Sequence, residues 1–88
     1  MKNYRFKITG KVQGVYYRVS VQKNAKAAGY SGYVKNMPDG SVEAGVTCHA
    51  SKLEYFITLL KKGSQYSKVD AVEIEESNEQ FIEGFEVR

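Results

Sequence analysis

The sequence lacks the features that mark secreted, membrane-spanning and disordered proteins. Its one cysteine cannot form a disulfide within the chain or a cysteine-based zinc cluster. It has one proline, and its 42% hydrophobic and 26% charged residues are ordinary for a globular protein, which argues against disorder. It contains no apolar run of signal-peptide or membrane-spanning length and no Asn-X-Ser/Thr glycosylation site. We therefore expect a cytoplasmic protein that does not enter a membrane.

The length and charge of the chain limit the folds and the ligands that can be expected. Its 88 residues suit one small domain over residues 1–88 and are too few for a doubly wound nucleotide-binding fold or an eight-stranded α/β barrel. Lysine and arginine together number 13 against 10 acidic residues, which gives a net charge of +3. This mildly basic balance is compatible with an anionic ligand but does not by itself indicate nucleic acid.

The hydrophobic pattern predicts an alternation of strands and helices. Two-residue alternation predicts strands at 4–8, 30–35, 41–48 and 69–75, with a further short strand within 81–87. Apolar residues at helical spacing predict helices over 17–28 and 51–62. Gly10 is expected to end the first strand, and Ser51 with Glu54 forms the S-x-x-E pattern of a helix start.

This order of elements predicts the fold class. A β-α-β-β-α-β chain packs most simply as an α+β ferredoxin-like sandwich, with an antiparallel sheet of four to five strands and both helices on one face. No repeat, linker or low-complexity stretch divides the chain. Proteins of this fold have many functions, so the function must be argued from a site.

The segment from Gly10 to Arg18, GKVQGVYYR, places two glycines just before a predicted helix. Glycine lets successive N–H groups converge, and the helix N-terminus adds unpaired N–H donors. Arg18 adds a planar charged fork that suits two phosphate oxygens. These features predict an anion site, although a plain connector with a solvated arginine fits such a loop about as well. The nucleotide motifs G-x-x-x-x-G-K-[ST] and G-x-G-x-x-G are absent, which argues against a nucleotide triphosphatase.

Asn36 stands where a predicted strand meets a turn that contains Pro38, Asp39 and Gly40. In a β-α-β arrangement this strand end can lie beside the loop after the first strand, where an amide could hold a water molecule next to a bound anion. The other interpretation is an asparagine that bonds the backbone of its own turn. For an arbitrary asparagine in such a turn, this local role is the favoured one.

Two blocks of the sequence together resemble the acylphosphatase family. Residues 10–18 are similar to its signature G-[RK]-V-Q-G-V-x-[FY]-R. Residues 32–43, GYVKNMPDGSVE, are similar to its second block, G-[WY]-V-[RK]-N-x-x-D-G-x-V-E. The blocks have the family's usual separation, and the rest of the chain resembles it loosely. Family members are single domains of about this length with the ferredoxin-like fold.

The resemblance implies an enzyme that hydrolyses acyl phosphates to a carboxylate and inorganic phosphate, without metal or other cofactor. It implies that Asn36 positions the attacking water and that Arg18 and the loop before it hold the phosphoryl oxygens. The loop residues so implied are Gln13, Gly14, Val15, Tyr16 and Tyr17. Because a mixed anhydride already has a good leaving group, positioning and charge stabilisation can supply most of the catalysis. The expected partners are a small acyl phosphate and its phosphate product, bound by a monomer.

Two alternatives come from other classes of protein. One is an acylphosphatase-like domain that binds phosphate or a protein without turnover, because Tyr16 stands where relatives usually carry a smaller residue and could crowd the loop. The other is an RNA-recognition module, which stacks bases on aromatic residues of its first and third strands. The predicted strand 41–48 has no aromatic residue, and Tyr4 and Phe6 are expected to face the helices. We therefore expect no nucleic-acid partner.

Cys48 and His49 are the remaining candidates for a catalytic or metal-binding role. Neighbours on a strand point to opposite faces, so the two cannot easily share a metal ion. Cys48 continues an apolar strand face and is expected in the core, whereas His49 is expected at the surface.

Overall fold

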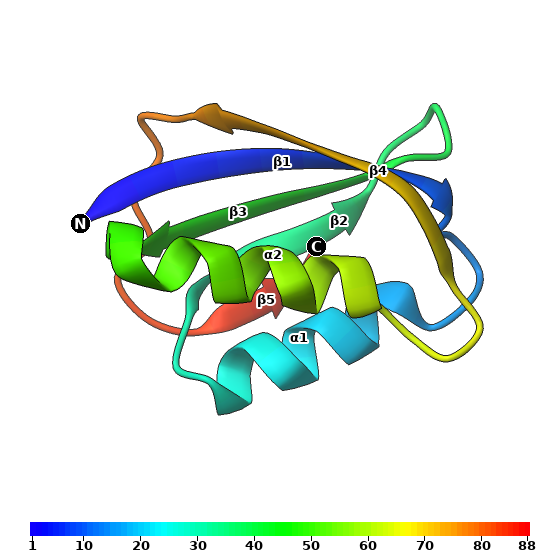
Figure 1. Ribbon diagram of the computed structural model, residues 1–88, viewed down its shortest axis with the longest axis horizontal. Coiled ribbons are helices and arrows are strands. Elements are labelled where there is room, and N and C mark those ends of the chain that lie inside the picture. Colours follow the sequence, from blue (N-terminus) through cyan, green and yellow to red (C-terminus); the bar gives the residue numbers. More distant parts are fainter.

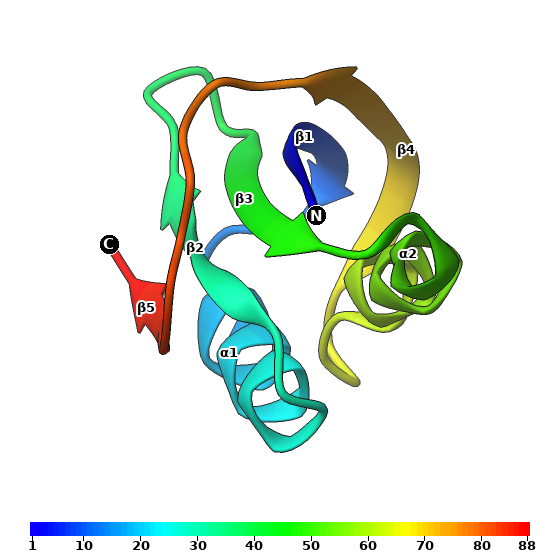
Figure 2. The same cartoon turned by 90° about the vertical axis from the view of Figure 1, so that its left-hand side faces the viewer.

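The computed structural model describes every residue from Met1 to Arg88. One five-stranded sheet, in the order β4-β1-β3-β2-β5, carries both α-helices on one face (Figures 1 and 2). The predicted α+β sandwich is therefore confirmed. The elements in chain order are β1 (Lys2–Lys11), α1 (Tyr17–Ala27), β2 (Ser31–Asn36), β3 (Val42–Cys48), the 3-10 helix η1 (Ala50–Lys52), α2 (Leu53–Lys62), β4 (Lys68–Glu76) and β5 (Phe85–Val87).

The sheet differs from the predicted antiparallel one at its β5 edge. β1 pairs antiparallel with β3 and β4, and β3 pairs antiparallel with β2, whereas β5 pairs parallel with β2. The reason is the path of residues 77–84, which run from β4 across to the opposite edge of the sheet before β5 begins (Figure 2). The predicted strand within 81–87 therefore shortens to its last part, because Phe81 belongs to this crossing segment.

The prediction that Gly10 ends the first strand is wrong. β1 continues to Lys11 through an irregularity in its pairing with β4 between Thr9 and Gly10. A Cβ atom at Gly10 would lie 2.2 Å from the carbonyl oxygen of Lys68, so only glycine allows the two backbones to approach this closely. The glycine thus permits the strand to continue past the bulge.

The predicted cap at Ser51 is also absent. Ser51 lies within η1, and the N–H of Lys52 donates to the carbonyl oxygen of His49 at 2.9 Å. This tighter turn places the start of α2 at Leu53, where no side chain caps the helix. The S-x-x-E pattern is therefore present in the sequence without its hydrogen bonds.

The core lies between the sheet and the two helices. Phe56 of α2 is 0% exposed, and its ring centroid lies 5.2 Å from Phe6, 5.0 Å from Tyr30 and 5.9 Å from Phe85. These contacts join α2 to both β1 and β5. The burial of Tyr4 and Phe6 in this cluster confirms that they face the helices.

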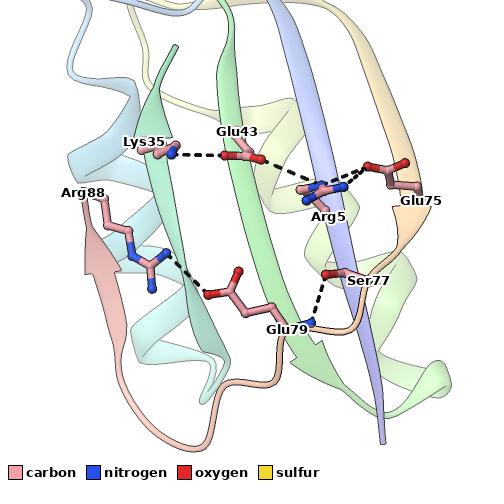
Figure 3. Close-up of polar contacts among 7 residues, drawn as sticks. All are labelled: Arg5, Lys35, Glu43, Glu75, Ser77, Glu79 and Arg88. Atoms are coloured by element: carbon pink, nitrogen blue, oxygen red, sulfur yellow. Dashed lines mark hydrogen bonds and ion pairs between the residues drawn. The ribbon is translucent and has the colours of Figure 1, made fainter.

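The other face of the sheet carries a row of ion pairs (Figure 3). Arg5 on β1 lies 2.6 Å from Glu75 on β4 and 3.8 Å from Glu43 on β3. Glu43 in turn lies 3.6 Å from the ammonium nitrogen of Lys35 on β2. Exposed pairs of this kind contribute about 0–1 kcal/mol each, so the apolar face supplies most of the stability.

We expect Phe56→Ala to lower the free energy of unfolding by about 3–5 kcal/mol, because it removes a fully buried ring and leaves a cavity between the sheet and α2. Urea denaturation followed by circular dichroism measures this change. The neighbouring Tyr55 is 57% exposed, so Tyr55→Ala should change the value by no more than about 0.5 kcal/mol. Equal losses in the two variants would contradict the placement of Phe56 in the core.

Candidate functional site

The loop of residues 12–16 between β1 and α1 has the backbone of an anion-binding turn. Gly14 and Tyr16 have left-handed φ angles of 71° and 60°. Left-handed residues in such a turn direct successive N–H groups to one side of the chain. The N–H groups of residues 13–19 donate no hydrogen bond to the protein backbone. A row of unpaired donors therefore lies at the N-terminus of α1, where the helix dipole also favours an anion.

The apolar side of this loop is anchored to the end of α2 and the turn that follows it. Val12 and Val15 are buried, and so is the ring of Tyr17, whose hydroxyl donates to the carbonyl oxygen of Leu60 at 2.7 Å. The hydroxyl of Ser64 donates to the carbonyl oxygen of Val15. These contacts anchor the loop through its side chains and the Val15 carbonyl, and they use none of its N–H groups.

The side chain of Gln13 has a role that the sequence did not show. Its Nε2 donates to the carbonyl oxygens of Met37 and Ser41, both at 2.8 Å. The amide therefore joins the loop to the turn between β2 and β3, close to Asn36. Both N–H donors of the amide are used in these two bonds, and the backbone N–H of Gln13 donates no hydrogen bond to the backbone.

Arg18 lies in the first turn of α1 and points towards the β5 edge of the sheet. Its Nη1 donates to the main-chain oxygen of Arg88 at 3.0 Å, and the N–H of Arg88 donates to the carbonyl oxygen of Val34 at 2.9 Å. Val34 precedes Asn36 by two residues on β2. These bonds therefore hold the guanidinium near the end of the strand that carries Asn36.

Asn36 is the last residue of β2, and its Oδ1 is buried without a hydrogen-bond partner. The turn that follows is closed by other groups, since the carboxylate of Asp39 accepts bonds from the Ser41 N–H at 2.9 Å and the Ser41 hydroxyl at 2.6 Å. The local role favoured from the turn sequence is therefore not seen. A buried acceptor without a partner costs about 1–3 kcal/mol, so a donor such as water or a ligand is needed to satisfy it.

A hollow of about 380 Å³ brings these groups together. Its walls include Arg18 and Asn36, as the resemblance implied, while Gln13 and Val15 are not among the residues that line it. Val15 instead packs into the core, with its carbonyl bonded to Ser64. The lining residues are Val12, Gly14, Tyr16, Tyr17, Arg18, Val19 and Asn36.

A second hollow, of about 330 Å³, lies on the open face of the sheet. Its charged walls are paired with one another, as Arg5 is with Glu75 and as Lys7 is with Asp39 at 3.3 Å. The basic groups here are already neutralised by carboxylates. The loop hollow is therefore the better anion site, although its volume is similar.

The other residues singled out from the sequence lie where predicted. Cys48 is buried in the core, and burial raises the pKa of its thiol, which makes it a poor nucleophile. His49 is exposed.

No three side chains of His, Cys, Asp or Glu gather as metal ligands do. Neither helix has the length and apolar character needed to cross a membrane.

Sequence reasoning missed three residues that contact the loop or Arg18. Ser64 and Tyr66 lie in the turn after α2, and Arg88 follows β5. Tyr66 places its ring centroid 6.3 Å from that of Tyr16. All three lie outside the two recognised blocks, and no local spacing connects them with the loop.

Comparison with known proteins agrees with the resemblance. The model of the acylphosphatase family matches residues 4–87. The acylphosphatase of Thermus thermophilus is 42% identical over 80 residues, which cover 91% of each chain. That of Methanocella arvoryzae is 39% identical over 88 residues, the whole of both chains. The crystal structure of the Bacillus subtilis acylphosphatase superposes with a TM-score of 0.90 at 35% identity, covering 100% of this chain and 99% of that one.

The turn beside the hollow should respond to acid through Asp39. Hydrogen bonds from Ser41, with Lys7 nearby, lower the pKa of Asp39 from 3.8 to about 2. Because the folded protein favours the ionised form, this stabilisation is complete above about pH 4 and is lost as the pH falls towards 2. In Asp39→Asn, the free energy of unfolding should decline less steeply over this range.

Urea denaturation at a series of pH values measures the slope of the free energy of unfolding against pH. Ser41→Ala removes the hydroxyl that donates to Asp39, so it should give an intermediate slope. Identical slopes for the wild type and Asp39→Asn would show that this carboxylate does not contribute.

Proposed function

The chain belongs to the acylphosphatase family, and we propose that it hydrolyses acyl phosphates in the hollow formed by the 12–16 loop, Arg18 and Asn36. The products are a carboxylate and inorganic phosphate. One arrangement carries the proposal: unpaired loop N–H groups, an arginine and a buried, unpartnered amide oxygen meet at one hollow.

The loop and Arg18 hold the phosphoryl group in this proposal. The first turn of α1 contains no acidic residue, so no carboxylate competes with the anion for the N–H groups. A guanidinium has five N–H donors, and the bond to Arg88 accounts for one of them. The remaining N–H donors can contact two phosphoryl oxygens, while the bond to Arg88 sets the orientation of the guanidinium plane.

Asn36 positions the attacking water. Its buried Oδ1 accepts a hydrogen bond from the water, which directs the water oxygen towards phosphorus. The new bond forms between this oxygen and phosphorus, while the bond from phosphorus to the acyl oxygen breaks. The acyl group leaves as a carboxylate, and both protons of the water remain on the phosphate. Since the carboxylate is a good leaving group, no side chain has to protonate it.

The position of Tyr16 favours an active enzyme over a binding domain without activity. Tyr16 is 72% exposed, and its ring centroid lies 6.3 Å from that of Tyr66. The ring therefore lies mostly in solvent, and a hollow of about 380 Å³ remains beside it.

We further propose a monomer that acts in the cytoplasm and binds no nucleic acid. The single cysteine is buried and unpaired, as is usual in a reducing compartment. The outer strand β5 is only three residues long, and the other edge, β4, carries charges that oppose pairing with a second sheet. On the open face of the sheet, the basic side chains of Arg5 and Lys35 are paired with carboxylates.

Arg18→Ala should lower kcat/KM for acetyl phosphate about a hundredfold or more, because it removes charge stabilisation of the phosphoryl group. Arg18→Lys should recover only a small part, since an ammonium group lacks the planar fork. Steady-state hydrolysis in buffer that contains a chelator measures this, and the wild type should be active there. Arg5→Ala, on the opposite face, serves as the control and should keep near wild-type activity. Activity indifferent to Arg18, or strictly dependent on added metal, would contradict the proposed mechanism.

Asn36→Ala should reduce kcat about a hundredfold while changing inhibition by inorganic phosphate less than about threefold, because it misplaces water and leaves the anion site intact. Initial rates across a phosphate series give both quantities. Asn78→Ala, in an exposed connector, is the matched control. A large loss of phosphate inhibition with kcat unchanged would instead make Asn36 a phosphate ligand.

A further inference from the structure

Two exposed tyrosines lie beside each other next to the hollow: Tyr16 is among its lining residues, and Tyr66 contacts Tyr16 from outside the lining. Tyr16 is 72% exposed and Tyr66 is 59% exposed, and their ring centroids lie 6.3 Å apart with the planes inclined at 52°. Tyr16 belongs to the 12–16 loop, and Tyr66 belongs to the turn between α2 and β4. The phosphate mechanism uses neither ring, although each exposes a large apolar face of the kind that binds ligands.

The backbone segments that carry the two rings are well defined. Tyr16 adopts a left-handed conformation, with φ 60° and ψ 23°, which is uncommon for a bulky residue. The turn that carries Tyr66 is braced by Ser64 and Ser67, because the Ser64 N–H donates to the Ser67 hydroxyl oxygen at 2.9 Å and that hydroxyl donates to the Ser64 carbonyl oxygen at 2.9 Å. Ser64 also donates to Val15 in the loop. The two backbone segments that carry the rings are therefore joined to each other beside the phosphate site.

The walls of the hollow limit the chemistry of the acyl group. A substituent on a phosphoryl group held by the loop must extend past the rim, where Tyr16 and the exposed Val19 offer apolar surface. Apart from Arg18, no charged side chain lines the hollow. A second carboxylate or phosphate on the acyl group would therefore find no dedicated partner in these walls, whereas a planar apolar group would find aromatic faces.

We propose that Tyr16 and Tyr66 form a platform that binds the acyl group and makes the enzyme favour aromatic acyl phosphates. This inference rests on the proposed hydrolysis in the same hollow. An aromatic acyl group would contact the two rings at offset or edge-to-face angles, as aromatic side chains do with one another. A small aliphatic acyl group such as acetyl is too short to cover them.

The test compares benzoyl phosphate with acetyl phosphate in Tyr16→Ala and Tyr66→Ala. Tyr66→Ala leaves the 12–16 loop intact, so it should lower kcat/KM for benzoyl phosphate about fivefold, mainly by raising KM, and should leave acetyl phosphate within about twofold. Tyr16→Ala alters the loop itself, so its readout is the ratio of kcat/KM for benzoyl phosphate to that for acetyl phosphate, which should fall about fivefold. Tyr16→Phe and Tyr66→Phe keep the rings and should retain the wild-type ratio between the two substrates. Tyr55→Ala removes a tyrosine of α2 that is about as exposed as Tyr66, and it should change kcat/KM for neither substrate.

Inhibition by inorganic phosphate separates the platform from a merely structural role. It should be unchanged in Tyr66→Ala, because Tyr66 lies outside the 12–16 loop that holds the phosphate. Equal losses for both substrates, together with weaker phosphate inhibition, would show that the rings only support the loop and would overturn the platform. Unchanged kinetics for both substrates would also overturn it. A wild type that hydrolyses neither substrate would instead reject the proposed function itself.

Discussion

The two hydrogen bonds from the Gln13 amide join the halves of the site. One half is the loop before α1, which supplies N–H groups and Arg18, and the other is the end of β2, which supplies Asn36. Gln13 connects them by donating to Met37 and Ser41 in the turn after Asn36. Each such bond contributes only about 1 kcal/mol to stability, but a displacement of about 1 Å can cost a hundredfold in rate. The importance of Gln13 therefore lies in geometry.

The loop separates a packing side from a binding side. Buried side chains and the bonds to Leu60 and Ser64 fill its lower side, so its conformation is stabilised by the same core that holds the sheet and helices together. Its N–H groups take no part in this packing and find no acceptor in the backbone. The basic side chains also differ between the open face of the sheet and the hollow. Arg5 and Lys35 are neutralised on the open sheet face, whereas Arg18 is the one charged side chain lining the hollow, so its local field matters more than the net charge of +3.

The repeat of apolar residues was sufficient to predict the sandwich, because strand and helix periods report which side chains face a core. Periodicity carries no information about the direction or partner of a strand. The parallel pairing of β5 with β2 depends on the crossing of residues 77–84, and the extension of β1 past Gly10 depends on its contact with β4. The start of α2 was misplaced for a related reason, since the turn bonded through His49 displaces the helix from its expected cap.

For the site, the amino-acid sequence alone determined which groups are available: a glycine-containing loop, an arginine at a helix start and an asparagine at a strand end. These are local properties of the chain, so motifs can report them. Only the tertiary structure decided that the Asn36 oxygen is buried without a partner, that the Gln13 side chain bridges two loops, and that Tyr66 lies against Tyr16. Each of these depends on contacts between residues far apart in the chain, and such contacts exist only once the core has brought the segments together.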